Sequence, residues 1–472
     1  MSITSTTFLF LFLPLLFPIY YLAPKPLKNT ILLGASLLFY IWGNPADLII
    51  LLLSILLNYI FANIIDLKKE KKTVSKLLLV ITVIFNLFIL ALYKYAGFIL
   101  DNINSLFNLS IDPPNLSLPL GISFFTFQGI SYVIDVYRNH AKSQKNLVTF
   151  ALYIAMFPKI SQGPIVRYHT IAEQLEERKE SLAKLVEGIQ RFITGLAKKL
   201  FIANNCGVVA DHVFSTPASD LSIGLAWIGI IAYTLQIYFD FSGYTDMAIG
   251  LGKMFGFDLP ENFNFPYISK SVSEFWRRWH MSLSSWFRDY LYIPLGGNRG
   301  TALQTYRNIF IVWMSTGVWH GAAWTFVAWG IYYGIIIMLE KAFILKLLKK
   351  FPVIFQHIYT LLLIVFGWVL FRAESITYAF NYLKSMVGLN NNTFWETEAS
   401  FYLIEYRIIL LLGIVFSMPV VSFVKKKILS VSTRLYSFVE DVVVPVVYLL
   451  LFLLTIAGMV SSTFNPFIYQ RF

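Results

Sequence analysis

Two histidines that lie inside long apolar sequence are the first residues whose chemistry needs explaining. His280 lies within 275–290, a segment with three Trp, three Arg and three Ser. His320 lies in a run that contains no Asp, Glu, Lys or Arg from Ile309 to Leu339. An imidazole can take a proton from a hydroxyl near neutral pH, and an ionisable group at membrane depth is a functional candidate because it is costly. We predict that His320 and His280 are both catalytic residues and that a histidine acts as a general base.

The residues around these histidines are candidates for substrate binding. Helical spacing predicts Trp276, Trp279 and His280 on one face of a helix, with Arg277 and Arg288 elsewhere. An amphipathic interfacial helix, with Trp and Arg at the headgroup level, is the alternative. The full set of candidates is Trp276, Trp279, Arg277, Arg288, Trp319, Ser315, Asp240, Asp246 and Gln236.

Two further segments have both a structural and a functional interpretation. Asp240 and Asp246 flank Gly243 within apolar sequence. They could position cations around a cavity, or they could be buried, paired acids at a helix break at Ser242-Gly243. The glycines of 295–300 could bind phosphate through backbone N–H groups, or they could form a turn between two helices.

Other kinds of catalytic site find no support in the sequence. Two isolated histidines do not make a metal site, and H-E-x-x-H spacing does not occur. A G-x-S-x-G motif and a P-loop do not occur either. We therefore expect no metal and no bound cofactor.

Composition indicates which elements must position these residues. Hydrophobic residues make up 57% of the 472 residues and charged residues 14%, whereas soluble domains have about 45–50% and 25%. The net charge of +12 does not indicate nucleic acid binding, because the cations cluster in short loops between apolar runs. The sequence predicts an all-α, polytopic membrane protein of 11–14 membrane helices, some broken or re-entrant. We predict one domain over 1–472, with N-terminal spans at 1–118, a core at 119–340 and C-terminal spans at 341–472.

The apolar stretch that contains His320 has an unusual length. It runs for 33 residues from Asn308 to Glu340, which as one helix would be about 50 Å long, against a hydrocarbon core of roughly 30 Å. Two full spans would need about 40 residues. We predict two shortened helices that meet at a bend at 317–321, with His320 at or beside the vertex, in a tunnel reachable from both faces.

Lysine-rich loops predict which segments face the cytoplasm. The loop 66–76 holds five lysines and 341–350 holds four, whereas 101–118 holds no Lys or Arg. We expect the first two inside the cell and the third outside, with both chain termini outside. The protein would then lie in the inner or plasma membrane, surrounded by lipid.

Several segments of the chain resemble one known family. They are Trp-Arg-Arg-Trp-His at 276–280, Leu-Ser at 283–284, 288–297, Gly-Val-Trp-His-Gly at 317–321, 119–125, 157–164, 238–244 and Pro-Phe-Ile-Tyr at 466–469. Together they are similar to the membrane-bound O-acyltransferases, most of all to the bacterial branch with the membrane components of alginate and peptidoglycan O-acetyltransferases.

The resemblance implies acyl transfer from a cytosolic donor, such as acetyl-CoA, to a hydroxyl of a cell-envelope polysaccharide. It implies helices arranged around a central tunnel, with His320 catalytic and His280 beside it. It also implies a partner, an extracytoplasmic esterase-like acetyltransferase that acts on the polysaccharide. Alternatives are D-alanyl transfer to teichoic acid from a carrier protein, a solute transporter and a structural scaffold.

Overall fold

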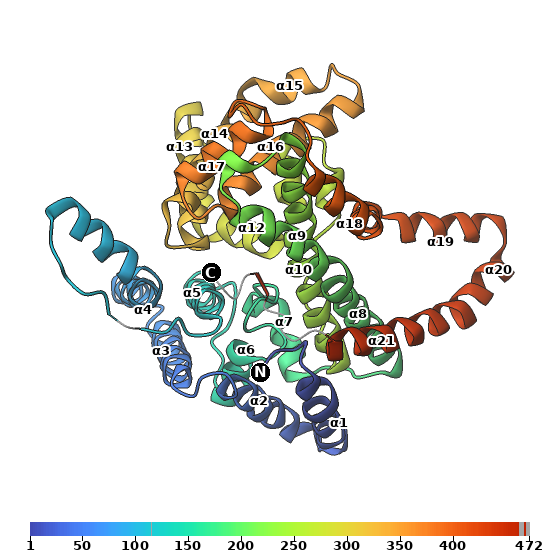
Figure 1. Cartoon of the computed structure of the whole chain (residues 1–472). Coiled ribbons are helices and arrows are strands. Elements are labelled where there is room, and N and C mark those ends of the chain that lie inside the picture. The colour runs from blue at the N-terminus through green and yellow to red at the C-terminus, as the bar shows by residue number, and fades with distance from the viewer. Residues whose placement is uncertain (115, 462–466, 469–472) are drawn as a thin grey trace. The chain divides into compact units, whose positions relative to one another are not determined.

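The computed structural model describes residues 1–114, 116–461 and 467–468 (Figure 1). Every regular element within these ranges is a helix, which confirms the predicted all-α class. Pro466 and Tyr469 of the terminal motif lie outside the described residues, and so does the C-terminus. The described chain forms two compact units. Two of the three boundaries between them fall within helices, and the third falls between Pro260 and Glu261, outside any helix.

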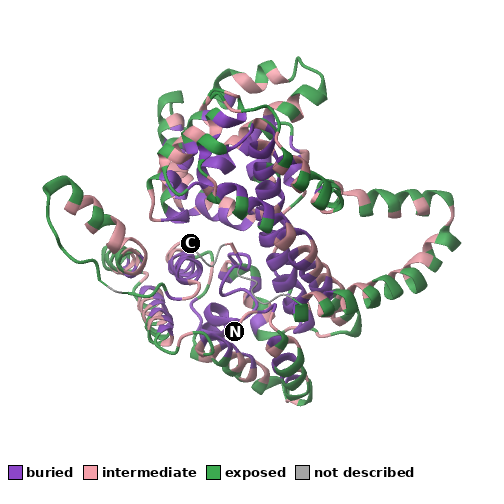
Figure 2. Cartoon of the chain, viewed as in Figure 1, coloured by how far each residue is buried: buried purple, intermediate pink, exposed green. Residues whose placement is uncertain are grey.

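Unit 1 comprises Met1–Phe192 and Met247–Pro260. Its complete helices are η1 (Phe8–Phe12), α1 (Leu13–Leu22), α2 (Lys25–Ile41), α3 (Asp47–Leu67), α4 (Lys72–Phe107), α5 (Ile122–Tyr137), α6 (Leu147–Ala155) and α7 (Tyr168–Glu176). Helix α5 packs against α3, α4, α6 and α7, and nearly all of its residues are buried (Figure 2). Asn58 of α3 and Asn86 of α4 exchange two amide hydrogen bonds of 3.0 Å, so the buried polar groups between these helices are satisfied.

Unit 2 comprises Ile193–Asp246 and Glu261–Phe472. It holds most of α10 (Ile223–Met254), in which 78% of an apolar 18-residue window is buried. The other elements before residue 300 are η2 (Lys198–Ala203), α9 (Asn204–Ser215), η3 (Ala218–Asp220), η4 (Pro266–Ile268), α11 (Val272–Arg278), α12 (Met281–Phe287) and η5 (Arg288–Tyr292).

The second half of unit 2 packs α13 (Ala302–His320) closely on α14 (Trp324–Leu339). The elements that follow are η6 (Glu340–Ile344), α15 (Leu345–Leu348), α16 (Val353–Arg372), α17 (Ile376–Met386), α18 (Thr397–Phe416), α19 (Val420–Val431), α20 (Thr433–Phe438), η7 (Val439–Val443) and α21 (Val444–Ser461). Helices α18 to α21 are largely exposed (Figure 2).

Helix α10 is one continuous helix, so the predicted break at Ser242-Gly243 is wrong. Gly243 instead allows close approach: a Cβ there would lie 2.8 Å from the carbonyl oxygen of Gly195, which belongs to α8 (Leu182–Ala197). The prediction of buried, paired acids is confirmed. Asp240 forms a 2.5 Å ion pair with Lys199, and Asp246 forms a 2.6 Å ion pair with Lys198.

Six described segments are long and apolar enough to cross a membrane, which agrees with the predicted polytopic architecture. They are α3, α4, α10, α16, α18 and Thr433–Ser461. The other predicted spans fall on helices that are shorter or less apolar. Helix α4 continues to Phe107, so part of the predicted loop 101–118 is helical.

Candidate active site

The short helix α11 carries the first part of the site, and its start is fixed by three hydrogen bonds. Ser271 caps the helix by accepting from the N–H of Glu274 at 3.0 Å. The buried carboxylate of Glu340 accepts the N–H groups of Val272 and Ser273 at 2.7 and 2.8 Å. These bonds satisfy N–H groups that a helix start leaves without partners and place a negative charge at the positive end of the helix dipole.

Helix α11 ends at Arg278, so the prediction of one helical face for Trp276, Trp279 and His280 is wrong. Trp279 is extended, and His280 adopts a left-handed conformation with φ 45°. This conformation is uncommon for residues other than glycine and often marks a functional site. The turn brings the His280 ring against Phe241, with ring centroids 4.7 Å apart.

Asn262 fixes this turn from a separate segment of the chain. Its backbone carbonyl accepts the N–H of Met281 at 2.9 Å. Its side-chain Oδ1 accepts the N–H and hydroxyl of Ser282 at 3.1 and 2.9 Å, and lies 3.1 Å from Nδ1 of His280. Asn262 is fully buried. It precedes His280 by eighteen residues, and no periodicity in the sequence links the two.

The second part of the site is the bend between α13 and α14. Helix α13 ends at His320 and α14 begins at Trp324, so the predicted bend with His320 at or beside its vertex is confirmed. A Cβ at Gly317 would lie 2.4 Å from the carbonyl oxygen of Phe326, and one at Gly321 would lie 2.2 Å from the Phe326 ring. Glycine at both positions therefore allows the two helices to pack closely at the bend.

Aromatic rings hold both imidazoles in place. The His320 ring lies 5.0 Å from those of Trp319 and Trp329 and 5.2 Å from that of Phe371, in edge-on contacts. The His280 ring lies 6.1 Å from the Trp319 ring, so Trp319 contacts both histidines. Burial lowers the pKa of His280, which lies outside the six candidate spans, and its ring is therefore neutral at neutral pH.

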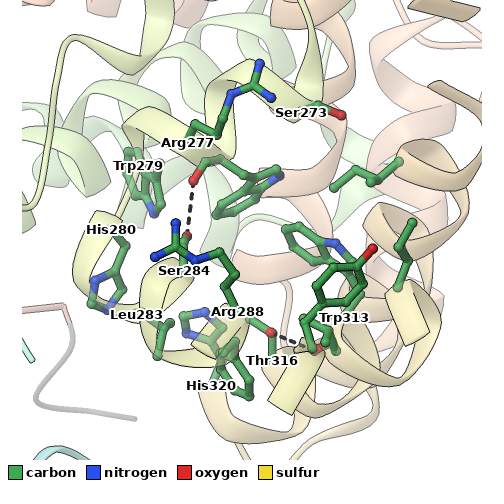
Figure 3. Close-up of a pocket in the computed structure, with 16 residues that line it drawn as sticks. Ser273, Arg277, Trp279, His280, Leu283, Ser284, Arg288, Trp313, Thr316 and His320 are labelled. Atoms are coloured by element: carbon green, nitrogen blue, oxygen red, sulfur yellow. Dashed lines mark hydrogen bonds between the residues drawn. The ribbon is translucent and has the colours of Figure 1, made fainter. Parts of the chain in front are cut away.

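The two histidines line one cavity of about 220 Å³ in unit 2 (Figure 3). Its wall includes Trp276, Trp279 and Trp313, and the exposed residues Arg277 and Arg288 also contribute. A volume below the roughly 300–1,000 Å³ of drug-sized ligand sites fits the reacting end of a larger substrate. The arrangement offers a neutral imidazole, a second imidazole and two cations around one small space.

The structure gathers some of the predicted site residues and not others. Trp276, Trp279, Arg277, Arg288, His280 and His320 line the cavity. The sequence predicts Arg277 and Arg288 away from the face that carries Trp276, whereas the structure places all three in the cavity wall. Trp319 reaches the site through its ring contacts. Ser315, Asp240, Asp246 and Gln236 are not among the residues that line the described cavity, and Thr316 lines it beside Ser315.

The sequence of the chain matches known proteins over most of its length. The model of the membrane-bound O-acyltransferase family matches residues 37–383. The chain belongs to this family. It is 39% identical to a probable alginate O-acetylase of Azotobacter vinelandii over the whole of both chains. It is 35% identical to a peptidoglycan O-acetyltransferase of Helicobacter pylori, over 81% of this chain and 79% of that one.

A more distant relative bears on the alternative acyl group. A teichoic acid D-alanyltransferase of Bacillus subtilis is 34% identical over 48% of this chain and 59% of its own. Membership of the membrane-bound O-acyltransferase family makes the chain an acyltransferase and a multi-pass membrane protein. The transporter and scaffold hypotheses are thereby set aside.

Several residues that line this cavity are not among the sequence predictions. Trp313, Thr316 and Ile337 come from α13 and α14, and Ser273, Leu283, Ser284, Phe287, Tyr292, Ile309 and Val312 complete the wall. Most are apolar and occur in a sequence rich in apolar residues, so composition does not distinguish them. Trp313 could have been predicted from the sequence, because it is the first residue of the aromatic segment that contains His320.

Proposed function

We propose that this enzyme transfers an acetyl group from a cytosolic thioester donor, such as acetyl-CoA, to a hydroxyl of a cell-envelope polysaccharide. The observation that carries the proposal is the single cavity that His280 and His320 share, in a chain whose full-length relative is a probable alginate O-acetylase. The peptidoglycan O-acetyltransferase relative supports the same acyl group.

The reaction needs one base and no bound cofactor. His320 takes the proton of the acceptor hydroxyl as the oxygen attacks the thioester carbonyl. The tetrahedral intermediate then expels the thiolate, which receives that proton from His320. The ester forms, the thioester breaks and protons balance. The cation at Arg277 attracts the anionic donor, Arg288 contributes less because it is paired with Asp289, and the small cavity holds the acyl end of the donor.

Sidedness and partners complete the proposal. The lysine-rich loop 66–76 would face the cytoplasm and the chain termini the outside. An esterase-like acetyltransferase outside the membrane would then complete delivery to the polysaccharide. D-alanyl transfer is the second candidate, and its support is the more distant teichoic acid D-alanyltransferase relative.

One experiment tests the acyl group and the acceptor together. Envelope glycans from cells with the intact chain, without it, and with His320→Ala are purified, and mild base releases their ester-linked acids for identification. We expect acetate to disappear in the second and third samples. Loss of D-alanine with unchanged acetate would favour the second candidate, and unchanged esters in all three would overturn the proposal.

A further inference from the structure

The hydrogen bonds around Asn262 define which atom of its side chain faces His280. The main-chain N–H of Ser282 can only donate, and it lies 3.1 Å from the atom assigned as Oδ1. That atom must therefore be the carbonyl oxygen and not the amide nitrogen. The amide nitrogen then lies toward the hydroxyl of Thr245, at 3.5 Å.

The orientation of the amide determines the tautomer of His280. Oδ1 of Asn262 can only accept, and it lies 3.1 Å from Nδ1 of His280. Nδ1 must therefore carry the proton, and in a neutral ring Nε2 then carries a lone pair. Nε2 is buried and has no hydrogen-bond partner among the described residues, and the side chain lines the cavity (Figure 3).

We propose that Asn262 is a positioning residue that holds His280 as the Nδ1–H tautomer, so that Nε2 accepts a hydrogen bond from a second hydroxyl of the acceptor, other than the one that His320 deprotonates. This inference rests on the proposed function. A lone pair at Nε2 cannot stabilise the oxyanion of the tetrahedral intermediate, because that role needs an N–H donor. The geometry therefore assigns His280 to the hydroxyl substrate and not to the carbonyl of the acyl donor.

The surrounding backbone supports a positioning role for this segment. The N–H of Asn264 bonds to the carbonyl of Arg278 at 2.9 Å, and the N–H of Met281 bonds to that of Asn262. These two bonds fasten 262–264 along 278–281 and hold His280 in its left-handed conformation. Hydrogen bonds thus fix Asn262 through both its backbone carbonyl and its side-chain amide.

The test reads the tautomer directly, by ¹⁵N NMR of detergent-solubilised full-length protein labelled at histidine. The chain has six histidines, and His280→Gln identifies the His280 signals by their loss. We expect Nδ1 protonated and Nε2 unprotonated in the wild type. A wild-type His280 that carries its proton on Nε2 would overturn the proposal.

Two variants then separate tautomer control from simple support of the fold. Asn262→Leu removes the hydrogen-bond acceptor, so the Nε2–H tautomer should appear. We expect kcat to fall by about 100-fold, because misplacement of a reacting group costs on that order, with the donor KM unchanged. Asn262→Asp keeps an acceptor oxygen and should retain the Nδ1–H tautomer and more activity. Asn264→Leu is the matched control, because its side chain is exposed.

The outcomes distinguish this proposal from the proposed function. An unchanged His280 tautomer in Asn262→Leu would overturn the positioning role, whatever happens to activity. The predicted tautomers together with unchanged glycan esters in cells that lack the chain would support the positioning role and overturn only the proposed acetyl transfer.

Discussion

Each cavity histidine is held by different neighbours. Hydrogen bonding by Asn262 and an unusual backbone conformation place His280, whereas aromatic rings and a helix end place His320. Burial of a polar ring costs free energy unless partners compensate. Two such rings in one small cavity therefore indicate that the fold is built around their chemistry.

Replacement of either cavity histidine should remove activity and leave the fold intact. His320→Ala removes the proposed base, and we expect transfer to fall by at least about 100-fold. His280→Ala should also reduce it strongly. Acetyl transfer by purified protein measures the effect, and near-native thermal unfolding shows retained folding. His212→Ala is the control, because His212 is an exposed partner of Glu398 and its loss should leave the rate unchanged.

The cations of the cavity differ in how strongly they can attract an anionic donor. Arg288 forms a 2.6 Å ion pair with Asp289, so much of its charge is neutralised locally. Arg277 lines the cavity and is exposed. We therefore expect most of the attraction to come from Arg277.

Charge reversal at Arg277 should slow donor capture. We expect Arg277→Glu to lower kcat/KM by about 10-fold at low ionic strength, because long-range attraction becomes repulsion. The deficit should shrink as added salt screens the charges. A salt series with purified enzyme measures this, and Arg434→Glu on α20 is the control. A deficit that is independent of salt would mean that Arg277 acts by contact or anchoring instead.

The bend between α13 and α14 depends on its glycines. Gly317→Ala would place a methyl group 2.4 Å from a backbone oxygen, so we expect a loss of about 1–3 kcal/mol of stability. Gly34 of α2 is the matched control, because a Cβ there would meet nothing within 4 Å. Gly34→Ala should stabilise by about 0.5–1 kcal/mol. Thermal unfolding in detergent compares them, and equal effects would contradict the close-packing argument.

The helices show what the sequence can and cannot predict. The bend at His320 is predictable, because 33 apolar residues suit neither one span nor two. The continuity of α10 is not predictable, because a glycine such as Gly243 commonly marks a helix break. In the structure Gly243 instead allows α10 to pack closely against Gly195. The turn at His280 is equally hidden, since its left-handed backbone depends on hydrogen bonds from a distant asparagine.

For the molecule as a whole, the lysine-rich loop between α3 and α4 should face the cytoplasm. With the buried Cys206 replaced by Ala, a cysteine at the exposed position Glu70 should resist a membrane-impermeant thiol reagent in intact cells. A cysteine at exposed Ser110 should react. Both should react after the cells are opened. Labelling of the Glu70→Cys protein in intact cells would reverse the predicted orientation.

The cavity wall is drawn from one stretch of chain, Ser273 to Ile337. A ribosome adds about 5–20 residues per second, so this stretch is complete on the order of ten seconds before the last helices are made. Contacts between residues close in sequence form early and quickly. The cavity can therefore begin to form during synthesis. It can do so once α16 has placed Phe371 beside His320, before α18 to α21 are complete.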